Sequence, residues 1–181
     1  MLKPEEALLV VLDIQDIFMP DDSEVVKKYL RQASRIIKAI KLLNIPLLVT
    51  EQYPERFGTT NSTILEVLGD EVRMPKIEFG CLGNEAFRAV LAETGRKQIL
   101  ITGMEAHICV MQTALDALDT GYEVYLLQDA IVASRKAEYY AGMTRMQQAG
   151  AVCVTVEMAI FELLRKAGTP EFKKLLPLIK E

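Results

Sequence analysis

Six short apolar runs alternate with amphipathic segments along this chain, and this alternation constrains the fold more than any other feature. The run at residues 7–13, ALLVVLD, is continuously apolar and ends in an acid, as expected for a strand that helices cover on both faces. Further apolar runs lie at 45–51, 74–79, 98–103, 122–129 and 151–156. Such alternation indicates repeated βαβ units with right-handed crossovers. The sequence therefore predicts a doubly wound, three-layer α/β fold around a mostly parallel six-stranded sheet.

The segments between these runs carry helical patterns. From Ser23, which we expect to be the N-cap, apolar residues recur at steps of four and three and predict a helix to about Asn44. Further helices are expected at 61–68, 84–94, 109–120 and 135–149. The segment from Glu157 to Leu178 is also expected to be helical, and to pack on the edge of the sheet or on a partner subunit.

Composition and charge narrow the range of partners. Half of the 181 residues are apolar, which suits a single globular domain over residues 1–181. The formal net charge is −4 and neither sign forms a long run, so nucleic acid is not an expected partner. The first apolar run is too short to span a bilayer and lacks the basic start of a signal peptide. We therefore expect a soluble, cytoplasmic protein without a membrane partner. Its helical tail and apolar composition fit a homo-oligomer.

The three cysteines are irregularly spaced. An odd number of widely separated cysteines suits neither a disulfide framework nor a tetrahedral zinc site, so we expect reduced thiols. Cys153 lies inside a predicted strand and fits a small buried side chain. Cys81 lies near Lys76 in the sequence and can be interpreted as a buried structural side chain or as a functional thiol.

Asp13 and Cys109 are expected to converge, although they are far apart in the sequence. In open α/β sheets, ligands bind beyond the carboxyl ends of the strands, where the strand order reverses, and strands one and four commonly flank this crevice. The first run ends in Asp13, and the run at 98–103 leads into TGMEAHIC. A carboxylate at the end of a buried strand needs a cation to stay charged, and Lys76 is the candidate. The alternative for Asp13 and Lys76 is an ordinary solvated charge.

Cys109 is expected in the first turn of the helix after the fourth strand. Free N–H groups and the helix dipole favour a thiolate there, and with a nearby ammonium they would lower the pKa by about two units from ~8.5. The alternative is a small buried hydrophobic side chain. His107 precedes Cys109 by two residues, and on a helix side chains at this spacing point about 200° apart. His107 is therefore not the expected base for this thiol.

These residues resemble the cysteine hydrolases of the isochorismatase-like superfamily, which includes nicotinamidases and N-carbamoylsarcosine amidohydrolase. The resemblance runs from VVLDIQDIFM through MPKIEFGC to ITGMEAHICVMQTALDALDTGYEVYLLQDAI. It implies Asp13 as general base, Lys76 as its partner and as stabiliser of the thiolate, and Cys109 as nucleophile. It also implies a cis peptide at Met104–Glu105, with the N–H groups of Glu105 and Cys109 forming an oxyanion hole. The implied reaction is thiolate attack on an amide-like carbonyl, release of ammonia or an amine, and hydrolysis of a thioester.

Two departures from this family narrow the substrate. Nicotinamidases carry an Asp-x-His metal motif after the second strand and a further His, whereas TEQYP places Glu51 and Tyr53 at those positions and the chain has one His. We therefore expect no metal and no cofactor, and nicotinamide is disfavoured. True isochorismatases lack the nucleophilic cysteine, so Cys109 argues against isochorismate. TEQYP together with GMEAHICVMQTALD is similar to small isochorismatase-domain proteins of bacteria and mitochondria.

A substrate pocket is expected to be lined by residues in the loops after the strands. The candidates are Phe18, Tyr53, Phe57, Phe79 and His107. Each aromatic residue could equally belong to the core or to an interface, and His107 could have a structural role.

Three hypotheses for function remain open. The first is a metal-independent amidohydrolase that acts on a small carboxamide or carbamoyl compound. The second is a thiol redox protein, in which Cys81 is the candidate resolving thiol by position. The third is an oligomeric binding or scaffold protein in which the triad does not turn over.

Overall fold

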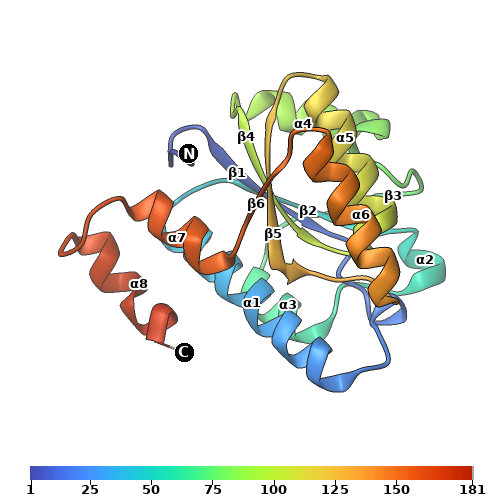
Figure 1. Cartoon of the computed structure of the whole chain (residues 1–181), viewed down its shortest axis with the longest axis horizontal. Coiled ribbons are helices and arrows are strands. Elements are labelled where there is room, and N and C mark those ends of the chain that lie inside the picture. The colour runs from blue at the N-terminus through green and yellow to red at the C-terminus, as the bar shows by residue number, and fades with distance from the viewer. Residues whose placement is uncertain (181) are drawn as a thin grey trace.

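The computed structural model describes residues 1–180, and a six-stranded sheet forms its centre (Figure 1). The strands lie in the order β3-β2-β1-β4-β5-β6, and all five neighbouring pairs are parallel. Their bounds are Ala7–Leu12 (β1), Leu47–Gln52 (β2), Arg73–Lys76 (β3), Gln98–Gly103 (β4), Glu123–Ile131 (β5) and Val152–Val154 (β6). The doubly wound α/β fold is confirmed, and the sheet is parallel throughout where a mostly parallel one was expected.

Helices cover both faces of the sheet (Figure 1). One face carries α1 (Ser23–Leu42), α3 (Ser62–Leu68), α7 (Val156–Leu164) and α8 (Pro170–Lys180), and the other carries α4 (Glu85–Glu93), α5 (Met111–Asp119) and α6 (Lys136–Gln148). Short pieces are α2 (Pro54–Phe57), the 3₁₀ turns η1 (Asp16–Phe18) and η2 (Cys81–Gly83), and the π-helical turn η3 (Ala106–Val110). Each face buries its own apolar cluster, which is why the strands read as continuous apolar runs.

The first helix begins as the sequence predicted, except for its cap. Asp22, not Ser23, is the N-cap, because its carboxylate accepts hydrogen bonds from the N–H groups of Glu24 at 3.0 Å and Val25 at 3.3 Å. A carboxylate at this position satisfies two free N–H groups and lies at the positive end of the helix dipole.

The C-terminal helices differ from the expectation in their placement. α7 packs on β5 and α1, and α8 packs on α1 and α7, so both belong to the layer on the α1 face and not to the edge of the sheet. Leu175 and Leu178 of α8 are buried in the apolar cluster of that face. Within residues 1–180, none of the helices combines the length and apolar character needed to cross a bilayer.

The strand order reverses at β1, which lies between β2 and β4. Leu12 is aligned with Thr50 on β2 and with Gly103 on β4. β4 approaches so closely that a Cβ atom at Gly103 would lie 2.1 Å from the Leu12 carbonyl oxygen, so only glycine fits there. The next residue, Asp13, has a φ of 52°, a left-handed conformation that Asp tolerates. These backbone features bring the end of β1 to the crevice between the two halves of the sheet.

Candidate active site

Asp13 and Lys76 form a buried ion pair at the carboxyl ends of β1 and β3. The Lys76 Nζ donates to Asp13 Oδ2 at 2.7 Å, and both side chains are 1% exposed. Thr50 Oγ1 donates to the other carboxylate oxygen, Oδ1, at 2.7 Å. The sequence expectation that Lys76 reaches Asp13 across the sheet is therefore met, and the alternative of two solvated charges is excluded.

The Lys76 ammonium has three further oxygen neighbours. It donates to the side-chain carbonyl of Gln52 and lies 3.0 Å and 3.1 Å from the backbone oxygens of Glu78 and Phe79. A lysine ammonium has three N–H donors, so four acceptors leave none free. Lys76 is thus held in place by its four acceptors.

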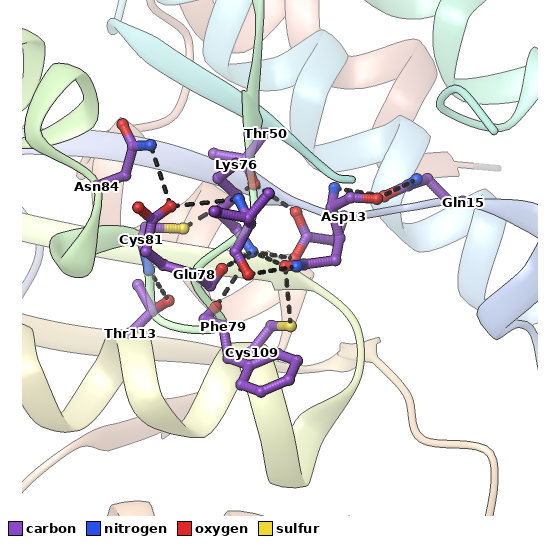
Figure 2. Close-up of polar contacts among 12 residues, drawn as sticks. Asp13, Gln15, Thr50, Lys76, Glu78, Phe79, Cys81, Asn84, Cys109 and Thr113 are labelled. Atoms are coloured by element: carbon purple, nitrogen blue, oxygen red, sulfur yellow. Dashed lines mark hydrogen bonds and ion pairs between the residues drawn. The ribbon is translucent and has the colours of Figure 1, made fainter. Parts of the chain in front are cut away.

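Cys109 lies in η3 and points toward this pair (Figure 2). Its side chain is buried, and its Sγ donates to Gln52 Oε1 at 3.8 Å. α6 packs tightly behind the turn, because a Cβ atom at Gly142 would lie 2.8 Å from the Ala106 carbonyl oxygen. The structure therefore brings the three expected residues to one place, with Cys109 in a π-helical turn and not in the first turn of α5.

The electrostatics of Cys109 differ from the sequence expectation. Burial raises the pKa of its thiol, and the Asp13 carboxylate raises it further, against the opposing charge of Lys76. Burial also raises the pKa of Asp13, although Lys76 and Thr50 act in the opposite direction. One buried ammonium balances one negative charge, so the site disfavours a second anion. The expected low-pKa thiolate is thus wrong for the resting site, in which Cys109 is a thiol and Lys76 balances Asp13.

A cis peptide bond joins Met104 to Glu105, at the position that the sequence implied. Among residues 1–180, no hydrogen-bond acceptor faces the N–H of Glu105. The Glu105 side chain lies 3.5 Å from Nε2 of His107. His107 thus neighbours the thiol as part of a separate pair, and its Nδ1 has no partner in the described part of the chain.

Comparison with known proteins places this fold and site in a family. The model of the isochorismatase domain matches residues 7–158. The chain belongs to the isochorismatase family of hydrolases. It is 38% identical to the secreted isochorismatase effector Isc1 of Phytophthora sojae, over 99% of this chain and 87% of that protein.

Solved isochorismatase-like structures have the same fold. A protein from Caenorhabditis elegans described as MAR1 ribonuclease is 29% identical, with a TM-score of 0.89 over 99% of this chain and 92% of that one. The YcaC gene product of Escherichia coli, described as an octameric hydrolase of unknown specificity, has a TM-score of 0.87 over 98% and 89% of the two chains. Its identity is 22%, so it supports the fold alone.

The position of the nicotinamidase metal motif has a different role in this member of the isochorismatase family. The Glu51 carboxylate accepts hydrogen bonds from Thr59 Oγ1 at 2.6 Å and from the N–H and Oγ1 of Thr60, both at 2.8 Å. Arg73 lies 3.5 Å away, and Tyr53 stands where a His ligand would be. Within residues 1–180, no three His, Cys, Asp or Glu side chains are grouped to hold a metal ion. The donor set does not fit a metal.

Three of the aromatic pocket candidates pack against one another. The Phe18 and Phe57 ring centroids are 5.3 Å apart, and those of Tyr53 and Phe57 are 6.0 Å apart, both with edge-to-face geometry. Phe79 is separate from them, with its side chain exposed and its backbone oxygen near Lys76. Their contact with a substrate stays a prediction.

Sequence reasoning missed the polar side chains that support the triad. Gln52 contacts both Lys76 and Cys109, Thr50 contacts Asp13, and the fully buried Cys81 lies 3.9 Å from Thr50 Oγ1. Burial raises the pKa of Cys81 to about 12. The one available signal was that Thr50 and Gln52 end an apolar run on either side of Glu51, where polar residues have no structural reason in a buried strand.

Proposed function

We propose that this protein is a cysteine-dependent hydrolase that cleaves the C–N bond of a small carboxamide or carbamoyl compound through a thioester intermediate. The observation that carries the proposal is the buried Asp13–Lys76 pair beside Cys109. A carboxylate with a raised pKa next to a thiol can take up the proton of that thiol and return it, as the cleavage of an amide requires.

In the proposed reaction, Cys109 Sγ attacks the substrate carbonyl carbon as its proton passes to Asp13. The carbonyl oxygen becomes an oxyanion, which accepts hydrogen bonds from the N–H groups of Glu105 and Cys109. Collapse of the adduct breaks the C–N bond, and the leaving amine takes the proton from Asp13. A water molecule then gives a proton to Asp13 and attacks the thioester, which releases the acid and restores the thiol.

Lys76 keeps the charge of the site constant through these steps. When the proton moves from Cys109 to Asp13, the carboxylate becomes neutral, the sulfur electron pair forms the C–S bond, and the negative charge appears on the carbonyl oxygen of the adduct. The ammonium balances the negative charge in either place, so no step creates a second buried anion.

The proposal also covers the substrate pocket, cofactors, oligomeric state and location of the enzyme. The aromatic residues Phe18, Tyr53, Phe57 and Phe79 and the neighbouring His107 are proposed to line the substrate pocket. Neither a metal nor a cofactor takes part in the proposed steps. A homo-oligomer and a cytoplasmic location stay predictions, and sedimentation analysis tests the first.

The test is a screen for ammonia release over a broad panel of small amides and N-carbamoyl compounds. We expect at least one compound to be hydrolysed by the wild-type protein and not by Cys109→Ser or Asp13→Asn. A panel on which all three proteins are equally inactive would contradict the proposal. Loss of one thiol per subunit to dilute peroxide without ammonia release would favour the redox hypothesis, and a tight complex unaffected by Cys109→Ala would favour a scaffold.

One arm of the screen uses single-stranded RNA, because a relative in Caenorhabditis elegans is described as a ribonuclease. The net charge of −4 does not favour a phosphate-rich substrate. Cleavage of RNA that depends on Cys109 would replace the amide proposal.

A further inference from the structure

Gln52, at the end of β2, contacts both Lys76 and Cys109. Its Oε1 accepts from the Lys76 ammonium and from the Cys109 thiol, and its Nε2 donates to the Ile77 backbone oxygen at 2.9 Å. An ammonium can only donate and a backbone oxygen can only accept, so these contacts fix the orientation of the amide. The side-chain oxygen of Gln52 therefore faces the sulfur.

Among residues 1–180, no hydrogen bond joins Lys76 to Cys109. The three N–H groups of Lys76 are taken up by Asp13, Gln52 and the backbone oxygens of Glu78 and Phe79. The carbonyl group of Gln52 lies between the ammonium and the sulfur, and its negative end is shared by both. The family's expected arrangement, in which the lysine stabilises the thiolate, is thus interrupted by a neutral acceptor.

We propose that Gln52 is a positioning residue that keeps Cys109 in the thiol form and keeps Lys76 paired with Asp13, so that the thiolate forms only as its proton passes to Asp13. This inference deepens the proposed function and rests on it for its consequence in turnover. Its chemical content, the proton affinity of one thiol, can be measured without a substrate.

The physical argument is a preference for one protonation state. An acceptor that faces an S–H group stabilises the neutral thiol, and its lone pairs would repel a thiolate, so the bond raises the proton affinity of the sulfur. Without Gln52, the three N–H groups of Lys76 keep three acceptors, on Asp13, Glu78 and Phe79, so the expected effect comes from the loss of the acceptor that faces the sulfur.

Other charged groups around Cys109 set the background for this effect. Asp13 from β1 disfavours the thiolate, Lys76 from β3 favours it, and Cys81 from η2 is a second thiol. On the same segment as Cys109, Glu105 and His107 contact each other. α6 packs against η3 through Gly142 and the apolar side chains of Met143 and Met146. Substitutions at Gln52 leave all of these groups in place.

The backbone of Gln52 is held independently of its side chain. Its N–H donates to Gln15 Oε1 at 2.7 Å, and its carbonyl oxygen accepts from Gln15 Nε2 at 3.0 Å. This two-point contact fixes the end of β2 whichever side chain stands at position 52. Gln52 is therefore suited to substitution by side chains of similar length.

The test measures the rate of iodoacetamide alkylation at Cys109 as a function of pH, with peptide mass spectrometry to separate it from Cys81 and Cys153. Below the pKa, the rate is proportional to the thiolate fraction. Gln52→Met removes the acceptor at nearly constant size, and we expect its rate at a given pH to rise about tenfold. Gln52→Glu keeps the shape and adds a negative charge, and we expect its rate to fall about tenfold.

Opposite signs separate this role from a structural one. A change in access to the sulfur or a looser fold would alter both variants in the same direction. Gln98→Met is the matched control, because Gln98 is also buried and hydrogen-bonded but lies at the start of β4, with Lys3 and Glu123. We expect its Cys109 rate to match the wild type, even if its melting temperature falls.

The inference is overturned if the rates of both Gln52 variants stay within twofold of the wild type or shift in the same direction. If Gln52→Met does not fold, the isosteric Gln52→Glu still decides by the sign of its shift. Shifts of opposite sign without any hydrolysed amide would support the role of Gln52 and contradict the proposed function. Amide hydrolysis by the wild type, together with alkylation rates that do not shift in the Gln52 variants, would support the proposed function and contradict the role of Gln52.

Discussion

Asp13 and Glu51 are two buried carboxylates near the carboxyl ends of the neighbouring strands β1 and β2. Their pKa values are shifted in opposite directions. Glu51 accepts three hydrogen bonds from Thr59 and Thr60, and although burial opposes ionisation, these bonds hold its pKa below the ordinary value. Asp13 has one hydroxyl donor and one ammonium, and burial holds its pKa above the ordinary value. Neighbouring strands thus carry one carboxylate whose pKa is lowered and one whose pKa is raised.

The difference indicates which carboxylate is available for proton transfer. Three hydrogen bonds to Glu51 Oε1 favour the charged carboxylate, so we expect Glu51 to act as an anchor for the segment that carries Thr59 and Thr60. A buried carboxylate that accepts few hydrogen bonds has a pKa raised toward neutral pH, and a raised pKa suits a general base. The number of donors, and not burial alone, separates the two roles.

The largest expected effect comes from removing the charge of Asp13. We expect Asp13→Asn to lose at least about 10³-fold in kcat on the amide found by screening, because the thiol then has no base. We also expect alkylation of Cys109 near pH 8 to become about tenfold faster, because the Asp13 carboxylate raises the pKa of that thiol. Paired kinetic and alkylation assays measure both.

The matched variant is Glu51→Gln, which removes a charge from the neighbouring strand end at constant shape. It should leave the alkylation rate of Cys109 within about twofold of the wild type, since Glu51 is engaged by Thr59 and Thr60. Equal acceleration in both variants would show that the two carboxylates are not electrostatically distinct.

The sequence was sufficient for the fold and for the convergence of Asp13, Lys76 and Cys109, for physical reasons. Continuous apolar runs are visible as strands without any knowledge of contacts, and Asp13 and Cys109 follow strands that must adjoin in a doubly wound sheet. Lys76 could be assigned because a buried carboxylate needs a cation.

The protonation state of Cys109 could not be predicted in the same way. It depends on which atom of Gln52 faces the sulfur and on how completely η3 is buried, and both are set by packing in three dimensions. The sequence places Cys109 near a helix start and a lysine, and both features favour a thiolate. Burial and the charge of Asp13 outweigh them in the folded chain.

The second prediction concerns the stability that the hydrogen bonds of Glu51 provide. Glu51→Ala leaves the donors of Thr59 and Thr60 without their acceptor, and we expect the free energy of unfolding to fall by about 2 kcal/mol, with a melting temperature about 4–8 °C lower. Glu66→Ala, at an exposed position of α3, serves as the control and should stay within about 0.5 kcal/mol of the wild type. Equal stability of the two variants would remove the anchoring role of Glu51.

The third prediction is the pH dependence of this contribution. The pKa of Glu51 is lowered on folding from 4.5, so its stabilisation is fully present above about pH 4.5 and is lost as the pH falls through the folded value. Asp13 has the opposite sign, since burial raises its pKa from 3.8 on folding. In urea unfolding, the gap between wild type and Glu51→Gln should therefore narrow below about pH 4.5. A gap that stays constant down to about pH 3 would argue against this linkage.

The smallest effects are expected from the hydroxyl donors, one on each carboxylate. Thr50 donates to Asp13 at 2.7 Å and Thr60 donates to Glu51 at 2.8 Å, and valine removes either hydroxyl at nearly constant volume. Thr50→Val should raise the pKa of Asp13 further and move the acidic limb of the pH–rate profile up by about half a unit to one unit. Thr60→Val should lower stability by about 1 kcal/mol and leave that limb in place. A limb that moves equally in both variants would mean that the two carboxylates share one titration, and the separation of roles between Asp13 and Glu51 would be lost.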